Sequence, residues 1–276
     1  MTMIGKRAFV IAGLTVLAVA AGARAVSAST VCDLRTALPT GSTCGIGGGL
    51  FATDEQHPTG TGYIDSFLRV QQNGTEQGYN TSARPVQFDE KTDPNYTRNL
   101  TLGEVATKTI GAVQYREFFL DINQAVPVPK SYLTLDQLQI FVSNTPSIQG
   151  GYSSVGANTG TGALAGATKI YDLDAGADNY VQLDYNLSGG GSGSSNMVFY
   201  LPDSLFGNYK YVYLFSQFGN IDGSANKYAS NAGFEEWFTK SPIPPPNTPV
   251  PEPGTLLLLG SGAIVAWRRR TLSSVL

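Results

Sequence analysis

Short stretches in which apolar and polar residues alternate dominate the middle of the chain, and Gly, Asn, Asp and Pro separate them. Alternation with a period of two is typical of half-buried β-strands, whereas amphipathic helices show a period of 3.6. The pattern predicts strands at residues 63–70, 115–122, 138–142, 169–173, 180–185, 196–201 and 209–218. Because helical periodicity is hard to find between residues 29 and 240, we expect an all-β fold.

The stretch 209–218 is apolar on both faces, because Tyr and Phe at odd positions alternate with Val212 and Leu214. A strand covered on both sides belongs at the centre of a packed structure. We expect it to pair with 196–201, and we expect 169–173 to form a hairpin with 180–185. The predicted architecture is a single antiparallel β-sandwich over residues 29–240, of jelly-roll-like type.

The first 28 residues have the pattern of a secretory signal peptide. Lys6 and Arg7 precede an uncharged apolar run, and small residues suit a cut before Ser29 or, alternatively, after Ala25. The run has about 15 residues, which is short for a membrane span of roughly 20. We expect a signal helix that uses the Sec translocon and is removed by signal peptidase, with an uncleaved anchor as the alternative.

The C-terminal end has three parts in a fixed order. A Pro-rich linker at 241–250 leads into Pro251-Glu252-Pro253, then an apolar stretch at 255–267, then Arg268-Arg269-Arg270. Consecutive prolines form a stiff, extended spacer. An apolar helix closed by arginines places them in the cytoplasm, so we expect a C-terminal transmembrane helix with the bulk of the chain outside the membrane.

This tail, residues 251–276, resembles the PEP-CTERM sorting signal of Gram-negative-type bacteria. The residues that carry the resemblance are Val250, Pro251, Glu252, Pro253, Arg268, Arg269 and Arg270. The resemblance implies recognition by an exosortase, a membrane peptidase with a cysteine nucleophile, which would cut near Pro-Glu-Pro and release or transfer the ectodomain. Proteins with this tail usually accompany exopolysaccharide and biofilm production, and the tail has also been labelled an ice-binding protein C-terminal domain. The alternative is a plain anchor that is never cut.

The net charge of the body restricts the classes of partner that it can bind. The whole chain of 276 residues has 18 basic and 21 acidic residues, a formal net charge of −3. Without residues 1–28 and 251–276, 12 basic and 20 acidic residues remain, a net charge of −8. This excludes a nucleic-acid binder that works through a basic face. It favours solubility and loose binding of cations.

Few residues suit catalysis or metal binding. The two cysteines, Cys32 and Cys44, predict a disulfide in an exported protein, because no cluster of Cys and His completes a metal site with them. His57 is the only histidine, and no G-x-S-x-G motif occurs in the body, so a hydrolytic triad is not expected.

Three aspartates suggest a cation site. Asp172, Asp174 and Asp178 surround a turn that contains Gly176. Hard oxygen ligands on a loop suit calcium, although the spacing does not match an EF-hand. The alternative is a solvated acidic turn, so calcium is the one cofactor that the sequence suggests.

Carbohydrate chemistry is the other candidate. Glu235 and Glu236 are adjacent in a predicted strand, so their side chains point to opposite faces and cannot flank one sugar bond. Tyr209, Tyr211 and Tyr213 could form a platform for sugar rings, but core packing also explains such a row. We expect a non-enzymatic surface or extracellular-matrix protein with weak binding of polysaccharide or other matrix components. The alternatives are a secreted polysaccharide-modifying enzyme, which would show a clustered pair of acids in a cleft, and a purely structural envelope component.

Overall fold

A computed structural model of the chain describes residues 28–54, 64–153, 162–188, 195–219, 228–231 and 233–240. These residues form β-strands with three short 3-10 helices, which confirms the expected all-β class. Within them no helix is long and apolar enough to cross a membrane. The predicted signal helix, linker and tail helix lie outside the described residues, and the domain limits drawn from the sequence stay predictions.

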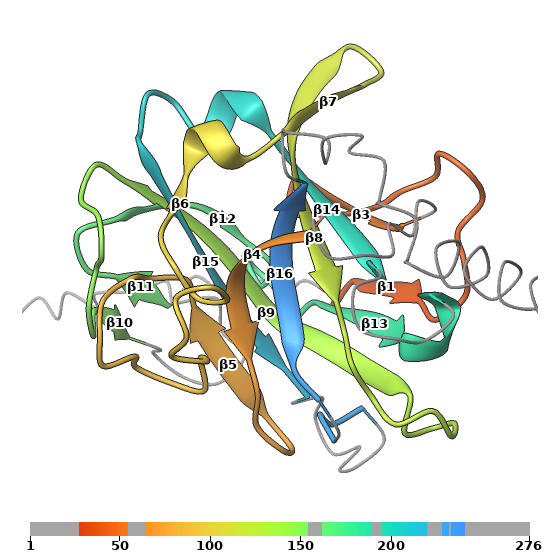
Figure 1. Cartoon of the computed structure of the whole chain (residues 1–276). Helices are drawn as coiled ribbons and strands as arrows, with labels where there is room; N and C mark the ends of the chain where they lie inside the picture. Colours follow the sequence, from red (N-terminus) through yellow and green to blue (C-terminus); the bar gives the residue numbers. More distant parts are fainter. Residues whose placement is uncertain are drawn as a thin grey trace, which may run out of the picture.

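Two seven-stranded sheets make up the body (Figure 1). The first, here called the β9 sheet, has the order β1-β13-β9-β15-β5, with β12 beside β9 and β6 beside β15. Its strands are β1 (Val31–Leu34), β5 (Glu76–Tyr79), β6 (Leu100–Thr101), β9 (Tyr132–Ser143), β12 (Thr168–Asp172), β13 (Tyr180–Asp184) and β15 (Tyr211–Phe218). All pairs in this sheet are antiparallel except β1 with β13, which is parallel.

The second, here called the β8 sheet, has the order β2-β3-β14-β8-β16-β4, with β7 beside β8. Its strands are β2 (Cys44–Ile46), β3 (Gly49–Thr53), β4 (Ile64–Val70), β7 (Thr107–Ile110), β8 (Val113–Asp121), β14 (Met197–Pro202) and β16 (Glu235–Lys240). The remaining elements are the pair β10 (Tyr152–Ser153) and β11 (Ala163–Leu164), and the 3-10 helices η1 (Leu102–Glu104), η2 (Tyr185–Ser188) and η3 (Asp203–Leu205).

One hydrophobic cluster takes side chains from both sheets. Leu138 and Ile140 of β9 belong to it together with Phe118 of β8, Phe199 of β14 and Trp237 of β16, all fully buried. In Figure 1 strands β4, β8 and β16 lie in front of β9 and β15. Burial of large apolar side chains is the dominant stabilising contribution to such a core.

Strand β15 confirms the expectation of a strand covered on both faces. Val212 and Leu214 belong to the cluster shared by the two sheets, whereas Tyr213 and Phe215 belong to a second cluster on the opposite face of the β9 sheet. In that second cluster the ring of Tyr152 stacks on Phe215, with ring centroids 3.9 Å apart. The short pair β10–β11 therefore covers the outer face of β15.

Two predicted pairings are wrong. Strand β14 pairs with β3 and β8, whereas β15 pairs with β9, β5 and β6 in the other sheet, so 196–201 and 209–218 do not pair. Two apolar strands joined by a short connection have the same pattern whether they pair or lie in facing sheets. Strands β12 and β13 do not form a hairpin either, because both pair with β9, at Gln139–Val142 and Tyr132–Leu135 respectively. The twelve residues of β9 leave room for two short strands end to end along one edge.

Candidate functional site

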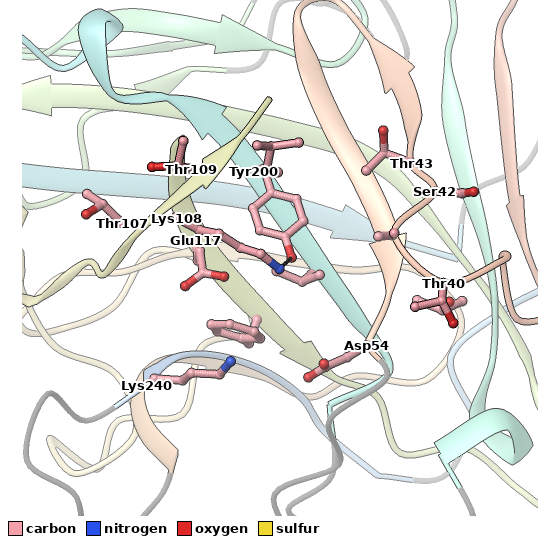
Figure 2. A pocket seen from close by; sticks show the side chains of 16 residues that line it. Thr40, Ser42, Thr43, Asp54, Thr107, Lys108, Thr109, Glu117, Tyr200 and Lys240 are labelled. Atoms are coloured by element: carbon pink, nitrogen blue, oxygen red, sulfur yellow. Dashed lines mark hydrogen bonds between the residues drawn. The ribbon is translucent and has the colours of Figure 1, made fainter. Parts of the chain in front are cut away.

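A cleft of about 560 Å³ lies on the face of the β8 sheet that points away from the shared core (Figure 2). Its floor comes from β3, β8 and β14, and its walls come from β7, the end of β16 and the loop 40–43. The lining residues are Thr40, Gly41, Ser42, Thr43, Ala52, Thr53, Asp54, Thr107, Lys108, Thr109, Ile110, Glu117, Phe119, Val198, Tyr200 and Lys240.

Strand alternation puts these side chains on the outer face. Phe118 and Phe199 point into the shared core, so their neighbours Phe119, Val198 and Tyr200 point outward and form a separate cluster with Ala52. The register places Glu117 of β8 directly opposite Tyr200 of β14. The floor of the cleft therefore combines aromatic and aliphatic side chains with one carboxylate.

The structure contains the expected disulfide between Cys32 and Cys44. Cys32 lies in β1 of the β9 sheet and Cys44 in β2 of the β8 sheet, so the bond joins the two sheets at one edge. The segment that it closes carries Thr40, Ser42 and Thr43 in the wall of the cleft. The two cysteines found by sequence therefore hold a wall of the candidate site.

Two lysines reach over the aromatic floor. Lys108 Nζ donates a hydrogen bond to Tyr200 Oη at 3.1 Å, and this bond raises the pKa of Lys108. Lys240 Nζ lies 4.5 Å from the centroid of the Phe119 ring. Lys108 Nζ also lies 5.2 Å from the centroid of the Tyr200 ring, so both lysines make cation–π contacts with the floor.

Two carboxylates share the cleft with these lysines. Glu117 is only 7% exposed, and burial, followed by weaker repulsion from Asp54, raises the pKa of its carboxyl group, while Lys240 and Lys108 oppose the rise. Among the described residues nothing forms a hydrogen bond or an ion pair with the Glu117 carboxylate. Asp54 is also buried, at the end of β3. Figure 2 shows both acids and both lysines around one opening. Among the described lining residues, two side chains are positive and two are negative.

The three aspartates suggested for calcium lie elsewhere, around the turn between β12 and β13. Asp172 forms an ion pair with Lys169 at 2.5 Å, and its other oxygen accepts the backbone N–H of Asp174 at 3.1 Å. Asp174 accepts the backbone N–H of Asn179 at 2.9 Å. Within the described part of the chain no group of three or more His, Cys, Asp or Glu is placed to hold a metal ion. These aspartates organise the turn, and calcium binding stays a prediction.

The other carbohydrate candidates do not gather in one place. Glu235 is buried with Glu76 and accepts a hydrogen bond from Gln124 at 2.5 Å, whereas Glu236 pairs with Arg69. Their different partners agree with the expectation that adjacent strand residues point apart.

In the tyrosine row, the hydroxyl of Tyr213 donates to the carbonyl of Thr145, and the Tyr213 side chain is fully buried. Tyr211 is partly buried and packs on the same cluster, and Tyr209 is 37% exposed. His57 and the sorting residues lie outside the described residues.

Sequence reasoning missed the cleft itself. Its charged members, Asp54, Lys108, Glu117 and Lys240, come from four strands or strand ends spread over most of the body, and no local motif joins them. One signal was present in the sequence, because Glu117 is a charged residue directly before the apolar residues Phe118, Phe119 and Leu120 of a predicted strand. A charge in such a strand marks either a solvated edge or a site.

Comparison with known proteins adds one finding. Residues 249–270 match the family model for the PEP-CTERM protein-sorting motif. No curated protein and no solved structure matches the chain. The match coincides with the tail whose Pro-Glu-Pro element, apolar stretch and arginines carry the resemblance noted above. The chain therefore carries a PEP-CTERM sorting motif, which supports export and sorting by an exosortase.

Proposed function

We propose that the body is a non-enzymatic component of the cell surface or extracellular matrix, and that it binds polysaccharide in the cleft of the β8 sheet. In this proposal the two sheets form a β-sandwich that displays the cleft, while the signal peptide and tail direct export. The tail anchors the chain in the inner membrane until an exosortase cuts it.

The chemistry of the cleft carries the proposal. Six hydroxyl side chains surround a floor with two aromatic rings; the hydroxyls are those of Thr40, Ser42, Thr43, Thr53, Thr107 and Thr109. Sugars offer hydroxyl groups for hydrogen bonds and apolar C–H faces for contact with rings. Pockets that combine an apolar floor with a few polar groups are the usual form of small-ligand sites. The volume of about 560 Å³ suits a short stretch of a glycan chain.

A second function, polysaccharide modification, is favoured by one observation. Asp54 and Glu117 line the same cleft, and burial raises the pKa of Glu117. A protonated acid beside an ionised carboxylate is the arrangement that glycosidases use. In that case Glu117 would protonate the leaving oxygen, and Asp54 would act as base or nucleophile.

Co-sedimentation of the mature protein with the extracellular polysaccharide of the producing cells tests both functions. We expect binding with no change in the chain length of the polymer. Shortening that is lost in Glu117→Gln would establish the enzyme instead. If the protein neither binds nor alters the polymer, a structural envelope component is the better account.

The intact mass of the protein recovered from the same cells tests sorting. We expect a mature chain that lacks the signal peptide and Arg268–Arg270. A chain that retains the three arginines would contradict processing of the tail.

A further inference from the structure

The Glu117 side chain is 7% exposed, and no described residue forms a hydrogen bond or an ion pair with its carboxylate. Its neighbours on β8, Phe118 and Phe119, are packed on opposite faces, so the strand register fixes the side chain toward the cleft. The side chain is mostly buried, but its carboxylate oxygens are accessible from the cleft, so they can accept hydrogen bonds from a ligand.

The charges around Glu117 restrict which ligand can donate these hydrogen bonds. Lys240 and Lys108 attract its negative form, and Asp54 repels it. A glycan with free amino groups would bring a positive charge against the two lysines. A uronic acid polymer would bring negative charge against Glu117 and Asp54, and the body as a whole carries a net charge of −8 between residues 29 and 250. Juxtaposed like charges are penalised in a partly desolvated site.

We propose that Glu117 accepts hydrogen bonds from two neighbouring hydroxyl groups of an uncharged sugar unit, so that the cleft selects neutral glycans that carry vicinal diols. This inference rests on the proposed binding of polysaccharide. A carboxylate has two acceptor oxygens and no donor, which matches the two O–H groups of a diol. Hydrogen bonds to an ionised acceptor are about twice as strong as those between neutral groups.

The two lysines complete the arrangement. An ammonium group only donates, so Lys240 can bond to a hydroxyl oxygen of the same sugar unit while that hydroxyl donates to Glu117. Lys108 donates a hydrogen bond to Tyr200 Oη at 3.1 Å, and Tyr200 lies directly opposite Glu117 in the paired strand. A site that is built to bond a hydroxyl group strongly rejects an analogue that lacks it, because its polar groups are then left unpaired.

The test uses chemically altered samples of the polysaccharide made by the producing cells, with the mature protein and co-sedimentation as readout. Carboxyl groups are reduced in one sample, amino groups are N-acetylated in a second, and vicinal diols are cleaved with periodate in a third. We expect the first two treatments to leave the affinity within about twofold of the untreated polymer and periodate to abolish binding.

Two variants accompany the samples. Glu117→Gln is expected to bind the untreated polymer at least tenfold more weakly, without a lower melting temperature, because glutamine keeps the shape of the side chain and no described residue bonds to the carboxylate. Asp93→Asn, an exposed acid outside the cleft, serves as the matched control and should bind like the wild type.

Each outcome bears on one claim. Binding that is lost on carboxyl reduction or N-acetylation would overturn selection of neutral glycans. Binding that survives periodate, or full affinity of Glu117→Gln, would overturn the role of Glu117. No binding of the untreated polymer would overturn the proposed polysaccharide function itself, and this inference with it.

Discussion

Substitution of Asp174 by Asn is expected to stabilise the protein above pH 7 and to flatten the pH dependence of its stability. The Asp174 side chain is 3% exposed, and one oxygen accepts the backbone N–H of Asn179 at 2.9 Å. Asn179 in turn accepts the backbone N–H of Thr30 at 2.7 Å, beside β1. Burial is the largest of the effects that raise the pKa of Asp174 to about 7, and the charges of nearby aspartates add to it.

The sign and size of the effect follow from linkage. The folded protein holds the Asp174 proton up to about pH 7, whereas the unfolded chain releases it near 3.8. The free energy of unfolding therefore falls as pH rises between these values. At 1.36 kcal/mol per pH unit the full loss is about 4 kcal/mol, of which about 3 kcal/mol falls between pH 5 and pH 8. Asparagine keeps the acceptor for Asn179 and does not titrate.

The predicted change is measured by urea unfolding of the wild type and Asp174→Asn at pH 5 and at pH 8. The free energy of unfolding of the variant minus that of the wild type should be about 3 kcal/mol larger at pH 8 than at pH 5. A difference that stays constant between the two pH values would refute the reasoning.

The same pair of proteins tests calcium. If Asp172, Asp174 and Asp178 bind the cation, added calcium will lower the pKa of Asp174 and raise the melting temperature of the wild type, and it will do neither in the variant. A wild-type melting temperature that is the same in calcium and in chelator would count against the site.

Three further perturbations follow from buried contacts. Reduction of the Cys32–Cys44 disulfide should lower the free energy of unfolding by about 3 kcal/mol, measured by urea unfolding. It should also weaken polymer binding in co-sedimentation, because the loop that forms a wall of the cleft is then no longer fixed. Unchanged binding after reduction would show that the disulfide does not support the cleft. Burial raises the pKa of both Glu235 and Glu76, so the free energy of unfolding of the wild type should fall as pH rises. Glu235→Gln should lose less stability over the same pH range. Parallel curves of stability against pH for the two proteins would contradict this. Arg69→Met should cost about 3 kcal/mol in thermal unfolding, because it leaves Glu236 buried without its ion pair; a loss below 1 kcal/mol would show that the pair contributes little.

Local patterns predicted the elements better than their arrangement. The alternation in 209–218 predicted a central strand, and β15 has both faces buried. The same pattern could not tell which strand lies beside it, because pairing in a sheet depends on crossovers such as the one through η3. The parallel pair β1 and β13 joins residues about 150 positions apart, for which no local signal exists.

For the candidate site, too, local features were predictable from the sequence and the spatial arrangement was not. The disulfide was predictable from two cysteines in an exported chain, and the sorting tail from its composition and order. The cleft was not predictable, because Asp54, Lys108, Glu117 and Lys240 meet only when β3, β7, β8 and β16 assemble. The acidic turn near Asp172 drew attention by its local density of carboxylates, yet Lys169 and backbone N–H groups already bind its oxygens.

Filling the cleft with a bulky side chain tests the central claim most directly. Thr43→Trp places an indole in the wall of the cleft, and Thr92→Trp, an exposed position outside it, is the matched control. In co-sedimentation with the polysaccharide of the producing cells, the wild type and Thr92→Trp should pellet with the polymer, and Thr43→Trp should remain in the supernatant. If Thr43→Trp pellets as well as the other two, the polymer binds elsewhere or not at all through this cleft, and the account is wrong.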